Sequence, residues 1–124
     1  MRSFLRLVIA LTLVVAAHAQ CKVYSGSSGY RIAARVEDGR VYAGSSGYTV
    51  IARVDGNRIL AGLNGYTVLA RVDGPRIYGG TGYTVIGRID GLKIYYGTGW
   101  FKVAARGEGC GVMSLVAGAV AACL

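Results

Sequence analysis

A seven-residue pattern recurs along this chain at a nearly constant interval, and it constrains the fold more than any other feature. The clearest copy is Arg53 to Ile59, with the sequence Arg-Val-Asp-Gly-Asn-Arg-Ile. Its relatives begin at Arg35, Arg71, Arg88 and, in degenerate form, Arg106. Successive leading arginines are 18, 18, 17 and 18 residues apart. A fixed period of this size indicates a repeat architecture.

Each copy has the chemistry of a tight β-hairpin. A two-residue loop at Gly56-Asn57 places Asp55 opposite Arg58, so an acid meets a base beside the turn. The next pair is β-branched and faces a core, and Arg53 then stands opposite Leu60 on the other face. The equivalent outer-face pairs, each a candidate cation–π contact, are Arg35 with Tyr42, Arg71 with Tyr78 and Arg88 with Tyr95.

The turn residues agree with this register. A loop that opens with glycine and continues at ordinary negative φ is a type II′ turn, whose twist matches the flanking strands. Pro75 after Gly74 requires this type, because proline cannot adopt the positive φ that a type I′ turn needs there. The first unit instead has Asp38-Gly39, the usual type I′ pair.

The hairpins predict an all-β protein: five repeats of about 18 residues in an antiparallel meander. An open meander of ten strands leaves two unpaired edges, so we expect closure into a shallow pseudo-symmetric barrel or flower. A column of small inward residues fits such closure: Ala33, Ala52, Ala70, Gly87 and Ala104. A β-solenoid is the alternative, but it would stack the repeated arginines with no acid between them.

The second strand of each unit begins with a glycine followed by an aromatic residue. In the second unit, period-two alternation places Val50 and Ala52 on one face and Ile51 and Arg53 on the other. The aromatic residues are Tyr30, Tyr48, Tyr66, Tyr83 and Trp100. We expect each to pack over its glycine at the hairpin base. The alternative is a ring of stacking platforms for a sugar or a lipid headgroup.

The two ends of the chain differ from the repeats. Residues 1–19 contain two arginines, an apolar run and Ala17-His18-Ala19, which predict a secretory signal peptide cleaved before Gln20. We therefore expect a secreted protein, or one of the periplasm or cell envelope. The repeat domain then spans 20–111.

Residues 112–124 form an apolar tail, in register with a degenerate sixth repeat. We expect a final strand or a short helix buried at the open end of the barrel, with insertion into a membrane as the alternative. The 14 apolar residues from Gly111 to Leu124 fall short of the ~20 needed for a transmembrane span.

Three cysteines remain after the predicted cleavage, and an exported chain is expected to pair two of them. Cys21 and Cys110 each precede a first-strand position by two residues, so ring closure would bring them together at the seam. Cys21 with Cys123 is the competing pair. Without a Cys-x-x-Cys motif or a histidine, no metal site and no cofactor are expected.

The net charge and the residue types present limit the functions that the chain can have. Removing the signal peptide leaves twelve bases against six acids, a net charge of +6, which favours an anionic glycan or lipid surface. No basic run predicts nucleic-acid binding, and one base per repeat is matched to a turn acid. Cleavage also removes His18, the only histidine. No other general base stands beside the serines, so we expect no enzyme.

The repeat also resembles a known family. An Ile-Tyr strand, a glycine, an apolar strand ending in Val-Asp-Gly or Ile-Asp-Gly and the next Ile-Tyr resemble the β-flower proteins, particularly the four-fold β-flower domain. The best match runs from Ile77-Tyr78 to Ile94-Tyr95, and the resemblance covers Val23 to Gly109. It implies a radially symmetric barrel of hairpin petals without an established activity, and no functional residues carry over. This chain differs in having five units instead of four.

Two functional hypotheses follow. The first is a binding module for an anionic or carbohydrate ligand, held multivalently by repeated outer-face residues: Arg35, Arg53, Arg71, Arg88, Tyr42, Tyr78 and Tyr95. The second is a structural or envelope-associated protein that assembles into a homo-oligomer through its apolar tail.

Overall fold

The computed structural model describes residues 20–99 and 102–124, so the predicted signal peptide at 1–19 and the aromatic residue Trp100 lie outside the described part. Within it the chain forms ten strands and one helix. The elements are β1 (Cys21–Ser25), β2 (Ile32–Glu37), β3 (Arg40–Ala43), β4 (Val50–Asp55), β5 (Arg58–Ala61), β6 (Val68–Asp73), β7 (Arg76–Gly79), β8 (Val85–Asp90), β9 (Lys93–Tyr96), β10 (Val103–Glu108) and α2 (Val112–Ala122).

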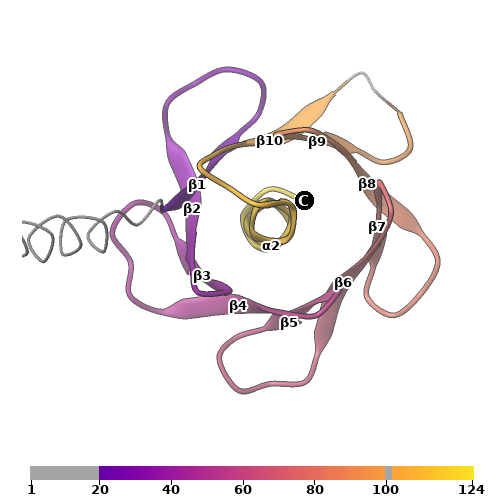
Figure 1. The fold of residues 1–124 in the computed structure, drawn as a ribbon, viewed down its shortest axis with the longest axis horizontal. Coiled ribbons are helices and arrows are strands. Elements are labelled where there is room, and N and C mark those ends of the chain that lie inside the picture. Colours follow the sequence, from indigo (N-terminus) through magenta and orange to yellow (C-terminus); the bar gives the residue numbers. More distant parts are fainter. Residues whose placement is uncertain (1–19, 100–101) are drawn as a thin grey trace, which may run out of the picture.

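The strands form a closed antiparallel barrel. Each strand pairs with its neighbours in the chain, and β1 pairs with β10 to complete the ring. The longer links at 26–31, 44–49, 62–67 and 80–84, and the described residues of a fifth at 97–99 and 102, radiate from the barrel as petals (Figure 1). We call this the petal end and the opposite one, with the two-residue turns, the turn end. The predicted hairpin barrel is confirmed, and the solenoid alternative is wrong.

The hairpins have the predicted turns and register. Asp38 and Gly39 both have positive φ, 52° and 75°, as a type I′ turn requires. Gly56, Gly74 and Gly91 have φ of 63°, 60° and 61°, while the residue after each does not, as type II′ requires. The arginines stand opposite Tyr42, Leu60, Tyr78 and Tyr95 as expected.

A β-bulge in each even-numbered strand corrects the predicted alternation. Val41 stands opposite Ala52 but Tyr42 stands opposite Val50, so Ile51 is an extra residue and packs against the core. The same shift places Ala33 and Ala104 at bulge positions. The inward column of small residues is therefore Ala34, Ala52, Ala70, Gly87 and Ala105.

The apolar tail is a helix inside the barrel. Figure 1 shows α2 at the centre of the ring, and its residues Leu115 to Ala119 are buried. The tail therefore fills the lumen, and neither a sixth strand nor a cover over the end is formed. Small residues on the wall leave space for a helix, because a ten-stranded barrel is wider than one that side chains alone can fill. Among the described residues, no helix has the length and apolar character that crossing a bilayer demands.

A disulfide fastens the seam as the sequence predicted. Cys21, the first residue of β1, is bonded to Cys110, which lies between β10 and α2. The bond ties both partners of the closing strand pair to the start of the central helix. Cys123 is the free cysteine of the described chain.

At Gly118 the helix lies close against the wall of the barrel. A Cβ built there would lie 2.5 Å from Cγ2 of Val23, which is fully buried in β1. We expect Gly118→Ala to destabilise the fold by about 1–3 kcal/mol through overpacking. Denaturant unfolding of Gly118→Ala, Val23→Ala and the double variant forms the test. The double variant should lose less than the sum of the single losses; additive losses would show that the two residues are not in conflict.

The disulfide closes a loop of 89 residues, and the chain-entropy relation gives about 4.6 kcal/mol for its contribution. We expect Cys21→Ser/Cys110→Ser to lower the free energy of unfolding by about this amount. Reductant should produce the same loss in the native chain and in Cys123→Ala, but none in the double variant. Unchanged unfolding in the double variant would contradict the predicted role of the bond.

Candidate functional site

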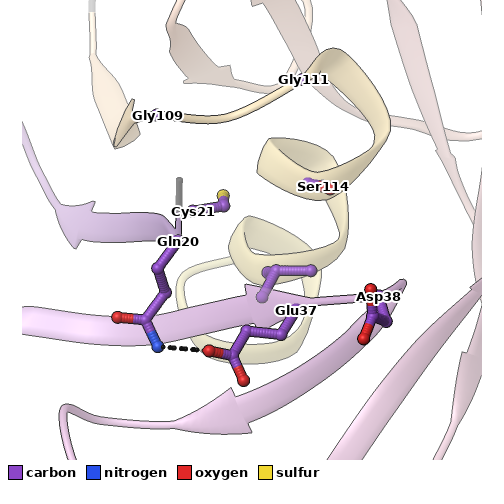
Figure 2. Close-up of a pocket in the computed structure, with 8 residues that line it drawn as sticks. Gln20, Cys21, Glu37, Asp38, Gly109, Gly111 and Ser114 are labelled. Atoms are coloured by element: carbon purple, nitrogen blue, oxygen red, sulfur yellow. Dashed lines mark hydrogen bonds between the residues drawn. The ribbon is translucent and has the colours of Figure 1, made fainter. Parts of the chain in front are cut away.

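One cavity opens at the turn end beside the start of α2 (Figure 2). Its volume is about 450 Å³, and the lining residues are Gln20, Cys21, Val36, Glu37, Asp38, Gly109, Gly111 and Ser114. The Nε2 atom of Gln20 donates a hydrogen bond to Oε1 of Glu37 at 3.0 Å. The lining offers the Ser114 hydroxyl but no imidazole or amine beside it. In the described part of the chain, no three potential metal ligands cluster together.

The leading arginine of each repeat holds the next petal around the ring, which for Arg106 is the first petal. Each guanidinium donates to backbone carbonyls of that petal or of its base. The contacts are Arg35 to Gly47, Arg53 to Ala61, Gly62 and Gly65, Arg71 to Gly82, Arg88 to Thr98, and Arg106 to Gly26 and Gly29. We call Arg35, Arg53, Arg71, Arg88 and Arg106 the clamp arginines.

Tyrosines sandwich several clamp arginines. The Cζ atom of Arg71 lies 4.6 Å from the ring centroid of Tyr78 and 4.9 Å from that of Tyr83. Arg35 lies 5.0 Å from Tyr42 and 6.0 Å from Tyr48. The predicted contacts of Arg35 with Tyr42 and of Arg71 with Tyr78 are confirmed, and each guanidinium lies near two aromatic rings.

The remaining clamps vary this arrangement. Arg53 faces Leu60 instead of a tyrosine and donates to three carbonyls, at 2.5, 3.2 and 3.5 Å. Arg88 and Tyr95 stand opposite each other in the strand register. Arg106 lies 4.8 Å from Tyr24 across the seam.

These contacts change the role expected for the arginines. The sequence placed Arg35, Arg53, Arg71 and Arg88 on an open outer face as ligand contacts. In the structure their guanidiniums bind the protein's own petals, and Arg35 is only 8% exposed. The clamp arginines thus fix the petal conformation, and a ligand would meet the petals first.

The petal tyrosines are the most exposed aromatic residues described. Tyr30, Tyr48, Tyr66 and Tyr83 are 94%, 90%, 88% and 85% exposed. The expectation that they pack over their glycines is therefore wrong for these four, whose side chains are exposed to solvent. They lie in the petals, outside the strands, where neighbouring residues are mostly glycine, serine and threonine. Short petals of such composition offer no apolar partner, and this signal was available in the sequence.

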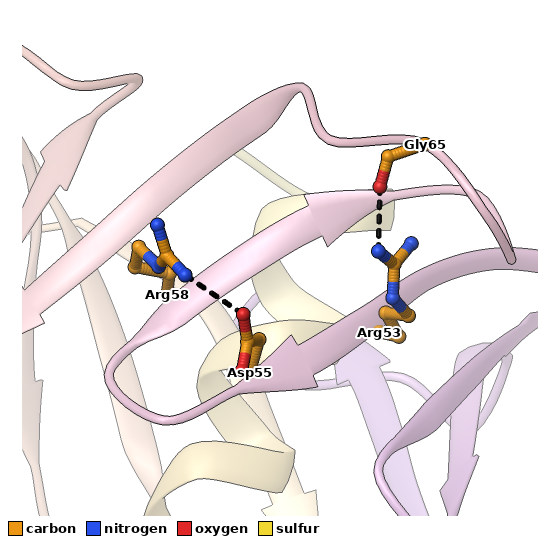
Figure 3. A network of polar contacts seen from close by, with 4 residues as sticks. All are labelled: Arg53, Asp55, Arg58 and Gly65. Carbon is orange, nitrogen blue, oxygen red and sulfur yellow. Dashed lines mark hydrogen bonds and ion pairs between the residues drawn. The ribbon is translucent and has the colours of Figure 1, made fainter.

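The two ends of the barrel differ in charge. At the turn end, Lys22, Arg40, Arg58, Arg76 and Lys93 each stand opposite an acid in the strand register, and Asp38 adds a sixth acid. Arg58 forms a salt bridge with Asp55, with 2.8 Å between nitrogen and oxygen. Arg53 of the same hairpin points towards the petal and donates a hydrogen bond to the Gly65 carbonyl (Figure 3). Within residues 20–99 and 102–124, the seven other bases have no acid opposite them: the clamp arginines with Arg31 and Lys102. The charge is therefore −1 at the turn end and +7 towards the petals.

Cys123 lies just beyond the helix, near the petal end. Burial raises the pKa of its thiol above the ordinary value, although a hydrogen bond with Ser25 acts in the opposite direction. The hydroxyl of Tyr96 donates to the Cys123 carbonyl at 3.2 Å. A thiol with a raised pKa is less often a thiolate at neutral pH, so this cysteine is poorly suited to nucleophilic chemistry.

Comparison with known proteins identifies the architecture. A family model described as "6-fold beta flower protein" matches residues 14–106. This confirms the resemblance to β-flower proteins, although the matching description is six-fold rather than four-fold. The described strands place five petals around the ring. Searches of curated proteins and of solved structures gave no match.

The contribution of a clamp arginine to stability can be tested within one hairpin. We expect Arg53→Gln to destabilise the fold by about 1–3 kcal/mol, because the carbonyls of petal 62–67 lose a charged donor. Hydrogen exchange should speed up at the amides of Ala61 and Gly62, which hydrogen-bond at the base of this petal. The matched control, Arg58→Gln, removes the same charge from an exposed ion pair and should cost about 0–1 kcal/mol. Equal effects of the two variants would argue against the clamp.

Proposed function

This chain belongs to the 6-fold beta flower family, and from that premise we propose that it is a non-catalytic module that binds carbohydrate through the exposed tyrosines of its petals. The observation that carries the proposal is the exposure of Tyr30, Tyr48, Tyr66 and Tyr83, each at an equivalent place around the ring.

The tyrosines suit recognition of sugars. A tyrosine ring is a rigid, amphipathic surface that gives contact area at low cost in conformational entropy. Its apolar face can pack against the C–H face of a pyranose while hydroxyl groups remain hydrogen-bonded. The petals supply such polar neighbours, including Ser45, Ser46, Asn64 and Thr81.

The clamp arginines support binding by fixing the petals in advance. A glycine-rich loop in solution would lose much conformational entropy when a ligand ordered it. Arg71 instead holds the Gly82 carbonyl at 2.8 Å and lies against the ring of Tyr83, so this platform is positioned in the free protein. Such preorganisation favours a higher affinity, since the petal loses less conformational entropy when a ligand binds.

The repeated petals, each with an exposed tyrosine, favour a polymeric ligand. One exposed ring gives only weak affinity, but several petals on one rigid barrel can engage successive units of the same chain. Linked binding events of this kind raise avidity by roughly 10²–10⁴ without new contacts. A glycan polymer fits this arrangement better than a free monosaccharide.

We also propose that the protein has no catalytic activity and is exported from the cytoplasm. The lining of the turn-end cavity includes no imidazole and no amine, and we assign the protein no catalytic step and no cofactor. We propose export from the cytoplasm, supported by the N-terminal segment and by the Cys21–Cys110 bond, since structural disulfides persist in oxidising compartments.

Assembly through the apolar tail is the less favoured hypothesis. Residues Leu115 to Ala119 are buried inside the barrel, which leaves little of the tail to form a contact between molecules. We therefore assign the tail to the core and the recognition function to the petals.

Binding to an array of purified polysaccharides, followed by titration of the best ligand, tests the proposal. We expect Tyr48→Ala/Tyr66→Ala/Tyr83→Ala to lose roughly 100-fold in affinity or more, because three platforms of a multivalent array are removed. Leu92→Ala is the matched control, because it removes a half-exposed apolar side chain at the turn end. Undiminished binding by the triple variant, or no polysaccharide binding by the native protein, would overturn the proposal.

A further inference from the structure

The petals are not equivalent in charge. The last residue of each petal, immediately before an even-numbered strand, is exposed in all five. It is threonine in three petals, at Thr49, Thr67 and Thr84. In the first petal it is Arg31 and in the fifth it is Lys102. The pseudo-symmetry of the ring is therefore broken at two positions, each time by a base.

These two petals flank the seam of the barrel. The first follows β1 and the fifth precedes β10, and β1 and β10 are the pair that closes the ring (Figure 1). The amide of Gly26 donates to the Ala104 carbonyl at 2.9 Å, which places the start of the first petal beside the start of β10. Lys102 precedes Ala104 by two residues. The bases thus belong to neighbouring petals and not to opposite sides of the ring.

The positive charge of the seam petals is free to meet a ligand. Arg31 has no ion-pair partner within residues 20–99 and 102–124, and the acids of the chain stand near the turn end. The ammonium group of Lys102 lies 5.3 Å from the ring centroid of Tyr96, a contact that leaves its charge intact. Arg106 also lies here and donates to Gly26 and Gly29, so its charge adds to the local field without a direct contact to a ligand.

We infer that Arg31 and Lys102, on the two sides of the seam, form an anion-selective subsite for an acidic polysaccharide and pair with its carboxylate or sulfate groups. The inference rests on the proposed carbohydrate binding and names the class of glycan. The petal tyrosines stack on sugar rings irrespective of charge, while the two bases distinguish an acidic polymer from a neutral one. Three petals that end in threonine provide the neutral part of the surface.

The composition of the petals favours a glycan over an anionic membrane. Interfacial binding to a bilayer depends on large apolar residues buried among the acyl chains, together with bases. Four petals, at 26–31, 44–49, 62–67 and 80–84, are mostly glycine, serine, threonine and tyrosine, and Leu63 is their one large aliphatic residue. In the sequence of the fifth link, Trp100 and Phe101 depart from this composition. The four petals can hydrogen-bond to sugar hydroxyls but offer little aliphatic surface to insert into lipid.

The experiment compares a polyuronate with its carboxyl-reduced neutral counterpart, each at two salt concentrations, with the purified protein. We expect Arg31→Thr/Lys102→Thr, which installs the residue of the other petals, to weaken polyuronate binding at least tenfold and to reduce its salt dependence. Affinity for the neutral polymer should stay unchanged. The control Arg58→Thr/Arg76→Thr removes the same two charges at the turn end and should leave both affinities as they are.

The outcomes separate this inference from the proposed function. Equal native affinity for the two polymers would overturn the subsite and leave carbohydrate binding intact. An equal loss in both double variants would also overturn it, because net charge alone would then explain the preference. Binding to neither polymer would overturn both proposals. Binding to vesicles containing anionic phospholipid as tight as to the polyuronate, with the same loss in the seam variant, would replace the glycan by a membrane.

Discussion

Pairing of β1 with β10 is the interaction on which the rest of this structure depends. A meander of hairpins has two free edges, and this one ladder removes both of them. Closure also creates the lumen that α2 fills and brings Cys21 beside Cys110. The contact between the first and last strands therefore decides whether the local hairpins become a protein with a core.

The lumen and the helix are matched in size. Each β-branched residue of an odd-numbered strand faces a small residue on the next strand, as Val41 faces Ala52 and Ile59 faces Ala70. Alternation of large and small residues leaves an even wall, against which the alanine- and glycine-rich helix packs. Close contact of Gly118 with Val23 shows how little space remains between them. The apolar tail thus forms the core of the barrel, because the side chains of the strands alone cannot fill so wide a lumen.

The clamp arginines connect this core to the surface where we place recognition. Their positive charge is partly neutralised by carbonyl dipoles and aromatic faces, so it is tolerated in a position with no acid opposite it. Bases at the turns are instead held opposite acids. This division leaves one end of the barrel nearly neutral and gives the petals the excess of positive charge. Arg31 and Lys102, which are not clamps, are the bases of that excess with a free charge to offer.

The sequence by itself determined the hairpins: their number, their turn types and the pairing of each arginine with Tyr42, Leu60, Tyr78 or Tyr95. Turn geometry and period-two alternation act over a few residues, so they can be read locally. The seam disulfide also followed from the sequence, because closure of a repeat fixes which residues meet.

Only the tertiary structure decided the rest. The bulge that turns Ile51 inward depends on how neighbouring hairpins pair around a curved wall. The position of α2 depends on the width of the lumen. Donation by the arginines to petal carbonyls and the exposure of Tyr30, Tyr48, Tyr66 and Tyr83 depend on where each petal lies relative to the wall. These are distances between segments that the ring brings together, and a repeat pattern fixes spacing along the chain but not distances across the ring.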